Sequence, residues 1–143
     1  MLVVLVLIFG SLLAALVPLA VAFVTMLLAM LLMFLLTLFT EPSSFVTNIT
    51  VFLGLGLAID YSLLMVSRYR EELRRGRETP DAIRTMLRTS GRTVLFSAIT
   101  VAVALGALLV FPFTIFDSMA YASIATALLA AAASLVVVPA LLA

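Results

Sequence analysis

Residues 45–77 read FVTNITVFLGLGLAIDYSLLMVSRYREELRRGR, an apolar run that passes directly into a charged one. The 23 residues from Phe45 to Ser67 contain a single charge, that of Asp60. A helix needs about 20 apolar residues to cross the roughly 30 Å hydrocarbon core of a bilayer. The run is continuous rather than alternating, which disfavours the strands of a membrane barrel. The stretch therefore predicts a membrane-spanning helix with an arginine-rich exit.

The composition of the whole chain extends this prediction. Of the 143 residues, 66% are hydrophobic and 10% are charged, and the mean hydropathy is +1.38. A soluble domain has roughly 45–50% apolar and about 25% charged residues. We therefore expect an integral membrane protein whose fold is an all-α, polytopic transmembrane helix bundle. The chain has no Cys and no His, which excludes thiol and imidazole chemistry and the usual zinc sites, so no metal site is expected.

The other apolar runs add further spans to one bundle over residues 1–143. The expected complete spans are residues 12–39, 45–67, 93–110 and 118–143, and residues 1–9 form a partial span. Nine residues rise only about 13 Å as a helix, which is too short to cross the bilayer. We therefore expect the sequence to begin inside a span and to be a fragment of a longer protein.

The charges lie unevenly at the two ends of these spans. All eight basic residues are Arg, and all lie in residues 68–92 beside four acidic residues, which gives this segment a net charge of +4. The loops 40–44 and 111–117 carry one acidic residue each. By the positive-inside rule, residues 68–92 are cytoplasmic. The expected anchors at the inner surface are Arg68, Arg70 and Arg92. Nucleic-acid binding is not expected, because the basic segment is also acidic and lies between spans.

The cytoplasmic segment has its own helix pattern. Thr79 suits an N-cap, Pro80 suits the first helical position, and an acidic residue favours the positive end of a helix. Apolar residues then fall on one face, and Gly91 is expected to end the helix. We expect a short amphipathic helix on the inner membrane surface. The alternative is a solvated linker.

Asp60 is the one charged residue inside any expected span. It precedes Arg68 by eight residues, or about 12 Å of helix, which places it near the bilayer midplane. A central Asp costs about 2.5–3.5 kcal/mol on insertion scales and is usually kept for proton or ion handling. Tyr61 adjoins it but points about 100° away, so it suits a carboxylate on a partner helix. The alternative is that Asp60 only joins helices through a hydrogen bond.

Small and hydroxyl residues surround this position. Gly54 and Gly56 allow another helix to approach closely, and they lack the surrounding pattern of a nucleotide site. In the following span, Ser97 and Thr100 share a face, and Thr100 reaches about the depth of Asp60. Thr100, and less so Ser97, are therefore possible neighbours of the Asp60 carboxyl. The alternative is the usual bond from the hydroxyl to a carbonyl of its own helix.

These residues occur in stretches that together resemble the MMPL transporters, the mycobacterial membrane protein large family of the resistance-nodulation-division superfamily. Residues 54–72, GLGLAIDYSLLMVSRYREE, resemble the fourth transmembrane helix of that family. Residues 90–102, SGRTVLFSAITVA, continue the resemblance, which also covers Pro112, Tyr121 and residues 139–142. The start resembles the turn between helices two and three, with Gly10 where members often have Arg. The chain thus resembles the end of helix two through helix six of one transporter half.

The resemblance implies a function. In the family, each half carries an Asp-Tyr pair, and protons that pass through these pairs drive the export of lipids or other hydrophobic molecules. By resemblance, Asp60 and Tyr61 are the proton-relay pair, protons are the coupling ion, and no cofactor is needed. The implied partners are membrane lipids, a lipid or hydrophobic substrate, and a missing second half with its own Asp-Tyr pair. The implied location is the bacterial inner membrane.

Two other functions suit a polytopic bundle. The first is a non-transport membrane module of similar helix layout, such as a sterol-sensing or secretion-assisting bundle. The second is an intramembrane aspartyl protease, whose chemistry needs two carboxylates that share a proton. Only Asp60 lies within an expected span, so proteolysis is not expected and the chain is not predicted to be an enzyme. The Asp-Tyr pair and the Arg-rich exit favour the transporter.

Overall fold

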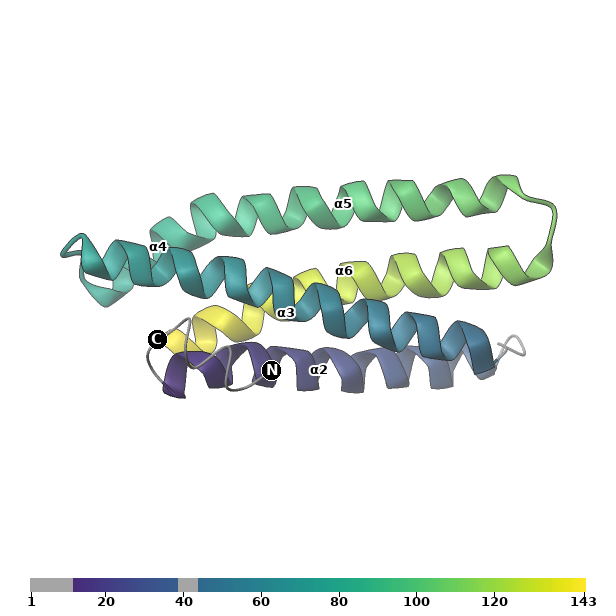
Figure 1. The fold of residues 1–143 in the computed structure, drawn as a ribbon, viewed down its shortest axis with the longest axis horizontal. Coiled ribbons are helices and arrows are strands. Elements are labelled where there is room, and N and C mark those ends of the chain that lie inside the picture. The colour runs from purple at the N-terminus through teal and green to yellow at the C-terminus, as the bar shows by residue number, and fades with distance from the viewer. Residues whose placement is uncertain (1–11, 39–43) are drawn as a thin grey trace.

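The computed structural model describes residues 12–38 and 44–143, in which every regular element is a helix (Figure 1). The long helices are α2 (Leu12–Thr37), α3 (Ser44–Arg74), α5 (Arg92–Gly106) and α6 (Thr114–Leu142). The short elements are helix α4 (Thr79–Met86), a π-helical turn η1 (Leu87–Gly91) and a 3-10 turn η2 (Ala107–Val110). The prediction of an all-α bundle is confirmed for these residues.

Four stretches of helix are long and apolar enough to cross a membrane. They are Leu16–Thr37, Val46–Arg74, Thr79–Val110 and Thr114–Leu142. Their order matches the four complete spans expected from the sequence. The expected partial span, residues 1–9, and residues 40–43 of the expected outer loop lie outside the described residues.

Helices α3 and α6 form the centre of the bundle. α3 packs along both α6 and α2, while α5 packs along α6 and scarcely contacts α3 (Figure 1). The contacts between helices are made largely by small residues, and α6 alone buries six alanines, at positions 120, 122, 127, 130, 131 and 133. This arrangement leaves one long face of α3 uncovered by the described part of the chain.

Helix α3 continues seven residues beyond the expected end of its span. Its last turns carry Glu71 and Glu72 within ion-pairing distance of Arg68 and Arg75, at helical spacings of three and four. Such pairs stabilise a helix outside the bilayer. The helix stops where Gly76 takes a left-handed conformation with φ 83°, which a glycine adopts without steric cost.

The short helix α4 differs from its prediction at both ends. It begins at Thr79 with Pro80 in its first turn, but the N-cap residue is Glu78 rather than Thr79. It does not end at Gly91, because η1 carries the chain directly into α5. Gly91 has helical angles, φ −60° and ψ −40°, and a Cβ there would lie 3.2 Å from Cδ2 of Leu135 on α6. The prediction that Gly91 ends the helix is wrong, because this glycine serves helix packing.

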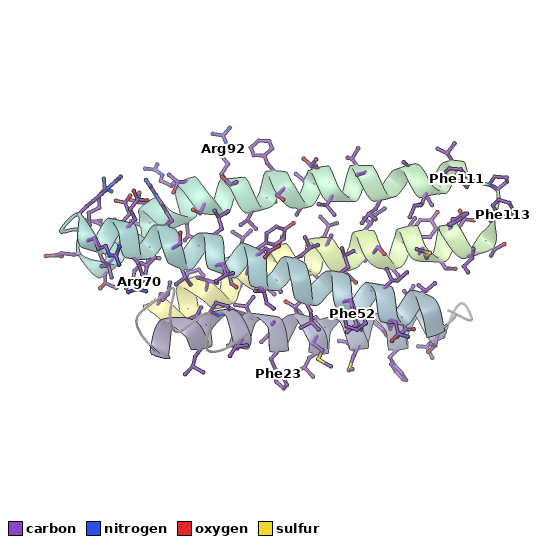
Figure 2. The ribbon with its side chains drawn as sticks, viewed as in Figure 1. Phe23, Phe52, Arg70, Arg92, Phe111 and Phe113 are labelled. Atoms are coloured by element: carbon purple, nitrogen blue, oxygen red, sulfur yellow. The ribbon has the colours of Figure 1, made fainter. Side chains whose placement is uncertain are left out.

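The two ends of the bundle differ in chemistry. Figure 2 shows Arg70 at one end and Phe111 with Phe113 at the other. The Phe116 ring lies 5.6 Å from that of Phe111 and 5.8 Å from that of Phe113, measured between centroids. Along the sides, large apolar residues face outward, such as Phe23 in Figure 2. An apolar exterior between a charged end and an aromatic end is typical of a bundle in a bilayer.

Candidate functional site

Helix α3 carries Asp60 near its middle, on the uncovered face. The exposed residues recur every four positions, as Phe52, Gly56, Asp60 and Leu64, a spacing that places them on one side of a helix. We call these four residues the Asp60 face. Among the described residues, nothing forms a hydrogen bond or an ion pair with the Asp60 carboxylate. The bundle therefore presents an uncompensated carboxylate halfway along a spanning helix.

Tyr61 points the other way, into the bundle. Its side chain is 4% exposed and belongs to a core cluster that includes Val21 of α2 and Ala130 of α6. Its hydroxyl is buried and has no hydrogen-bond partner in the described part of the chain. The two adjacent residues thus serve opposite sides of α3. A contact between Tyr61 and a carboxylate of a partner helix stays a prediction.

The two hydroxyl residues proposed as neighbours lie on α5. The Thr100 hydroxyl is exposed and donates a hydrogen bond to the Phe96 carbonyl at 2.8 Å, which is the usual arrangement within a helix. Ser97 is half-buried. Neither hydroxyl bonds to Asp60 among the described residues, in keeping with the scarce contact between α5 and α3. Their part in a relay remains a prediction.

The two glycines of α3 have different surroundings. A Cβ at Gly54 would lie 2.6 Å from Thr126 Cγ2. Helix α6 therefore lies too close to α3 at this point for position 54 to carry a side chain. A Cβ at Gly56 would meet no atom of the described residues within 4 Å. Gly54 therefore permits close packing inside this chain. Gly56 has no side chain, so the exposed side of α3 is open one turn before Asp60.

The charged end of α3 holds a second carboxylate in a different setting. Glu72 is fully buried, and its oxygens lie 2.8 Å from Arg68 Nη2, 2.9 Å from Arg77 Nε and 3.4 Å from Arg75 Nη1. Arg77 also donates a hydrogen bond to Thr85 Oγ1 of α4 at 2.6 Å. This group of charges ties the end of α3 to α4.

Sequence analysis did not identify Glu72 as buried, although arginines at helical spacing from it were a visible sign. Of the expected inner-surface anchors, Arg68 pairs with Glu71 as well as Glu72, and Arg70 is half-buried. Arg92 is exposed, with its guanidinium carbon 5.4 Å from the centroid of the Phe96 ring (Figure 2). All three lie at the charged end or near it.

Comparison with known proteins places this geometry in context. The MMPL family profile matches residues 1–143. The chain is 45% identical over 141 residues to membrane protein SCO6666 of Streptomyces coelicolor. It is 43% identical over 142 residues to the heme uptake protein MmpL11 of Mycobacterium tuberculosis. It is 41% identical over 141 residues to the trehalose monomycolate exporter MmpL3 of Mycolicibacterium smegmatis.

Each of these alignments covers 99% of this chain but only 20%, 15% and 14%, respectively, of the relative. The chain therefore spans a fifth or less of the length of these proteins. The aligned region includes the α3 helix with Asp60 and Tyr61 and the Arg-rich segment after it.

Proposed function

This chain belongs to the MMPL family of membrane transporters, and from that membership we propose that it is the membrane segment of a proton-motive-force-driven exporter of lipids or other hydrophobic molecules. In this proposal the segment lies in the bacterial inner membrane, with residues 68–92 on the cytoplasmic side. Asp60 carries the proton. The transporter moves its substrate without chemical conversion.

One observation supports the proposal above all others. Asp60 is the only charged residue between Pro42 and Arg68, and among the described residues the fold leaves it exposed and unpaired on α3. A carboxylate that faced lipid at this depth would cost about 2.5–3.5 kcal/mol or more. That cost is avoided where another protein surface or water covers the carboxylate. A group that takes up and releases protons must also be reached by water or by another proton-carrying group.

The shape of the Asp60 face supports a protein partner. Gly56 leaves open space one turn before Asp60, and small residues permit close contact between membrane helices. Phe52 and Leu64 add exposed apolar surface on either side. We therefore propose that the second half of the transporter packs over this face and brings its own Asp-Tyr pair to Asp60.

Tyr61 is the second member of the proposed relay. Its hydroxyl has no partner within the described residues, so it is free to donate a hydrogen bond to a carboxylate or a water molecule. Because the ring lies in the core of this half, contact with a carboxylate of the second half requires a change of rotamer. Water that reaches the hydroxyl from inside the bundle requires none.

The substrate class follows from the relatives by analogy. One relative is named for the export of trehalose monomycolate and another for heme uptake. Both cargoes are large and partly hydrophobic. We propose a lipid as the substrate of the complete transporter, and trehalose monomycolate is the probe with which to begin.

The test uses inverted membrane vesicles that contain the complete transporter, in which export is observed as uptake into the lumen. Trehalose monomycolate uptake should require an acidic lumen and should be abolished by Asp60→Asn at unchanged transporter abundance. Asp81→Asn is the matched control, because Asp81 is an exposed carboxylate of α4 and should leave uptake unchanged. Uptake that ignores the gradient, uptake that survives Asp60→Asn, or wild-type vesicles that fail to take up this lipid would each contradict the proposal.

A further inference from the structure

Three threonine hydroxyls inside the bundle have no hydrogen-bond partner among the described residues. They belong to Thr25 of α2, Thr50 of α3 and Thr126 of α6, and all three side chains are fully buried. Hydroxyls elsewhere in the chain bond to their own helix, as Ser134 does to the Ala130 carbonyl at 2.8 Å. A buried hydroxyl left without a partner costs about 1–3 kcal/mol. Three of them in one small bundle indicate a missing hydrogen-bonding ligand.

Two of the three threonines lie close to one glycine through their methyl groups. A Cβ at Gly54 would lie 2.6 Å from Thr126 Cγ2 and 3.7 Å from Thr25 Cγ2. Thr50 lies one helical turn before Gly54 on the same face of α3. The three threonines with unsatisfied hydroxyls therefore lie within about one helical turn of Gly54, on the three helices α2, α3 and α6.

A fourth unsatisfied hydroxyl lies deeper along the same interior. Tyr61 packs with Val21 and Ala130, which are each four residues, or one turn, farther from the aromatic end than Thr25 and Thr126. Its hydroxyl is likewise buried and unpartnered within the described residues. From Thr50 to Tyr61 the group extends about 16 Å along α3. The unsatisfied hydroxyls thus follow the bundle axis toward the residue beside Asp60.

A cavity lies about one helical turn beyond the other end of this group. A cavity of about 180 Å³ opens at the aromatic end of the bundle, and Val46, Ala122, Asp117 and Ser118 are among its lining residues. Val46 and Ala122 each precede a threonine of the group, Thr50 and Thr126, by four residues. One turn is about 5.4 Å, or roughly two hydrogen-bond lengths, so a single water molecule can bridge it.

We propose that the cavity and the four hydroxyls form a hydrated path through the interior of α2, α3 and α6, by which protons reach the Asp60-Tyr61 pair from the extracytoplasmic side. This inference rests on the proposed function, which supplies the direction of the proton gradient. The ligand is water, and the hydroxyls contribute to the two to four polar partners that each buried water needs.

Proton transfer along this path conserves atoms. Each hydroxyl or water accepts a proton from the outer side and releases another toward the inner side. One proton enters from water in the cavity, and one proton leaves from the Tyr61 hydroxyl. Because that hydroxyl lies in the core and Asp60 faces the other side of α3, transfer of the proton to the Asp60 carboxylate requires a change of the Tyr61 rotamer or a bridging water molecule. No oxidant, reductant or leaving group takes part.

The first test separates hydroxyl chemistry from packing. The complete transporter is prepared with Thr25, Thr50 and Thr126 all changed to Val, and in parallel with all three changed to Ser. Valine keeps the branched shape and removes the unsatisfied hydroxyl, so the Val variant should fold at least as stably as the wild type. Its gradient-driven uptake should fall about tenfold or more, because a positioned proton-transfer group contributes about 100-fold and water replaces part of it.

The Ser variant keeps the hydroxyls and should retain most of the uptake. Wild-type uptake by the Val variant would overturn the path. The two proposals fail separately: uptake by Asp60→Asn contradicts the relay, whereas uptake by the Val variant together with inactive Asp60→Asn contradicts the path alone.

The second test detects water directly and does not depend on transport. Thr126→Cys and Ala127→Cys are made in a complete transporter without other cysteines, and both positions are fully buried on α6. Silver ion is added from the extracytoplasmic side, and the thiol that remains is titrated after denaturation. Silver should consume the thiol at position 126 and spare the one at 127. Equal protection of both thiols, as in a dry interior, would overturn the inference.

Discussion

Helix α3 carries two carboxylates, twelve residues apart, that differ in burial and in ion pairing. Glu72 is fully buried and surrounded by Arg68, Arg75 and Arg77. Asp60 is exposed near the middle of the helix and has no partner among the described residues. The buried charge is compensated within the chain, whereas the charge at membrane depth is left uncompensated.

The difference in ion pairing suits a structural role for Glu72 and the proposed proton-carrying role for Asp60. A buried carboxylate paired with several arginines, as Glu72 is, serves structure. A carboxylate that must exchange protons cannot be held by a permanent cation, because such a cation opposes protonation. The same helix thus joins α4 through Glu72 and, under the proposed function, offers Asp60 to a partner and to water.

The largest stability effect should come from the structural carboxylate. Glu72→Ala leaves the arginines at the end of α3 without their buried partner, and we expect a loss of about 3 kcal/mol. That is the lower end of the usual range, because Arg75 and Arg77 remain about half-exposed to water. Glu71 pairs with Arg68 and Arg75 but is 46% exposed, so Glu71→Ala should cost less than about 1 kcal/mol. Denaturant unfolding of the complete protein in detergent measures both, and equal losses would remove the distinction.

A smaller effect on stability should distinguish Gly54 from Gly56, which lie on different faces of α3. Gly54→Ala places a Cβ 2.6 Å from Thr126 Cγ2, and such overpacking costs about 1–3 kcal/mol. Gly56→Ala meets nothing within 4 Å in this chain and should stabilise the isolated helix by up to about 1 kcal/mol. It should nevertheless lower transport, because the second half is proposed to pack there. Thermal unfolding and vesicle uptake of both variants check this, and a Gly56→Ala protein with normal uptake would argue against a partner on the Asp60 face.

The smallest effect is expected on α5. The Thr100 hydroxyl already bonds to the Phe96 carbonyl, so Thr100→Val should change the unfolding free energy by less than about 1 kcal/mol. Its uptake should fall far less than that of Asp60→Asn. A loss as complete as in Asp60→Asn, restored by Thr100→Ser, would instead place this hydroxyl in the relay of the complete transporter.

The sequence predicted the bundle because span length and continuous hydrophobicity are local properties. The number of complete spans follows from the lengths of the apolar runs, and the position of Asp60 within one of them can be read directly. The continuation of α3 to Arg74 was not predicted, because a charged segment suggests a solvated loop. In the structure these charges form ion pairs along the helix and extend it. Gly91 was misread for a related reason, since packing against Leu135 of α6 cannot be seen in the sequence around it.

The candidate site shows the same limit. Asp60 stands out because a charge near the middle of an apolar run can be found by counting along the sequence, and such a charge is costly in a bilayer. The group of Thr25, Thr50 and Thr126 could not be predicted, because a threonine in a helix normally bonds to its own backbone and the register between helices is unknown. The burial of Glu72 likewise depends on how α4 folds back onto α3.

The most direct measurement is gradient-driven lipid uptake per molecule of complete transporter, for Asp60→Asn beside Glu72→Gln. The first variant should be as abundant as the wild type and take up nothing. The second should be less abundant, and its remaining folded molecules should still take up lipid. Uptake by Asp60→Asn at the wild-type rate per molecule would contradict the assignment of Asp60 as the proton carrier.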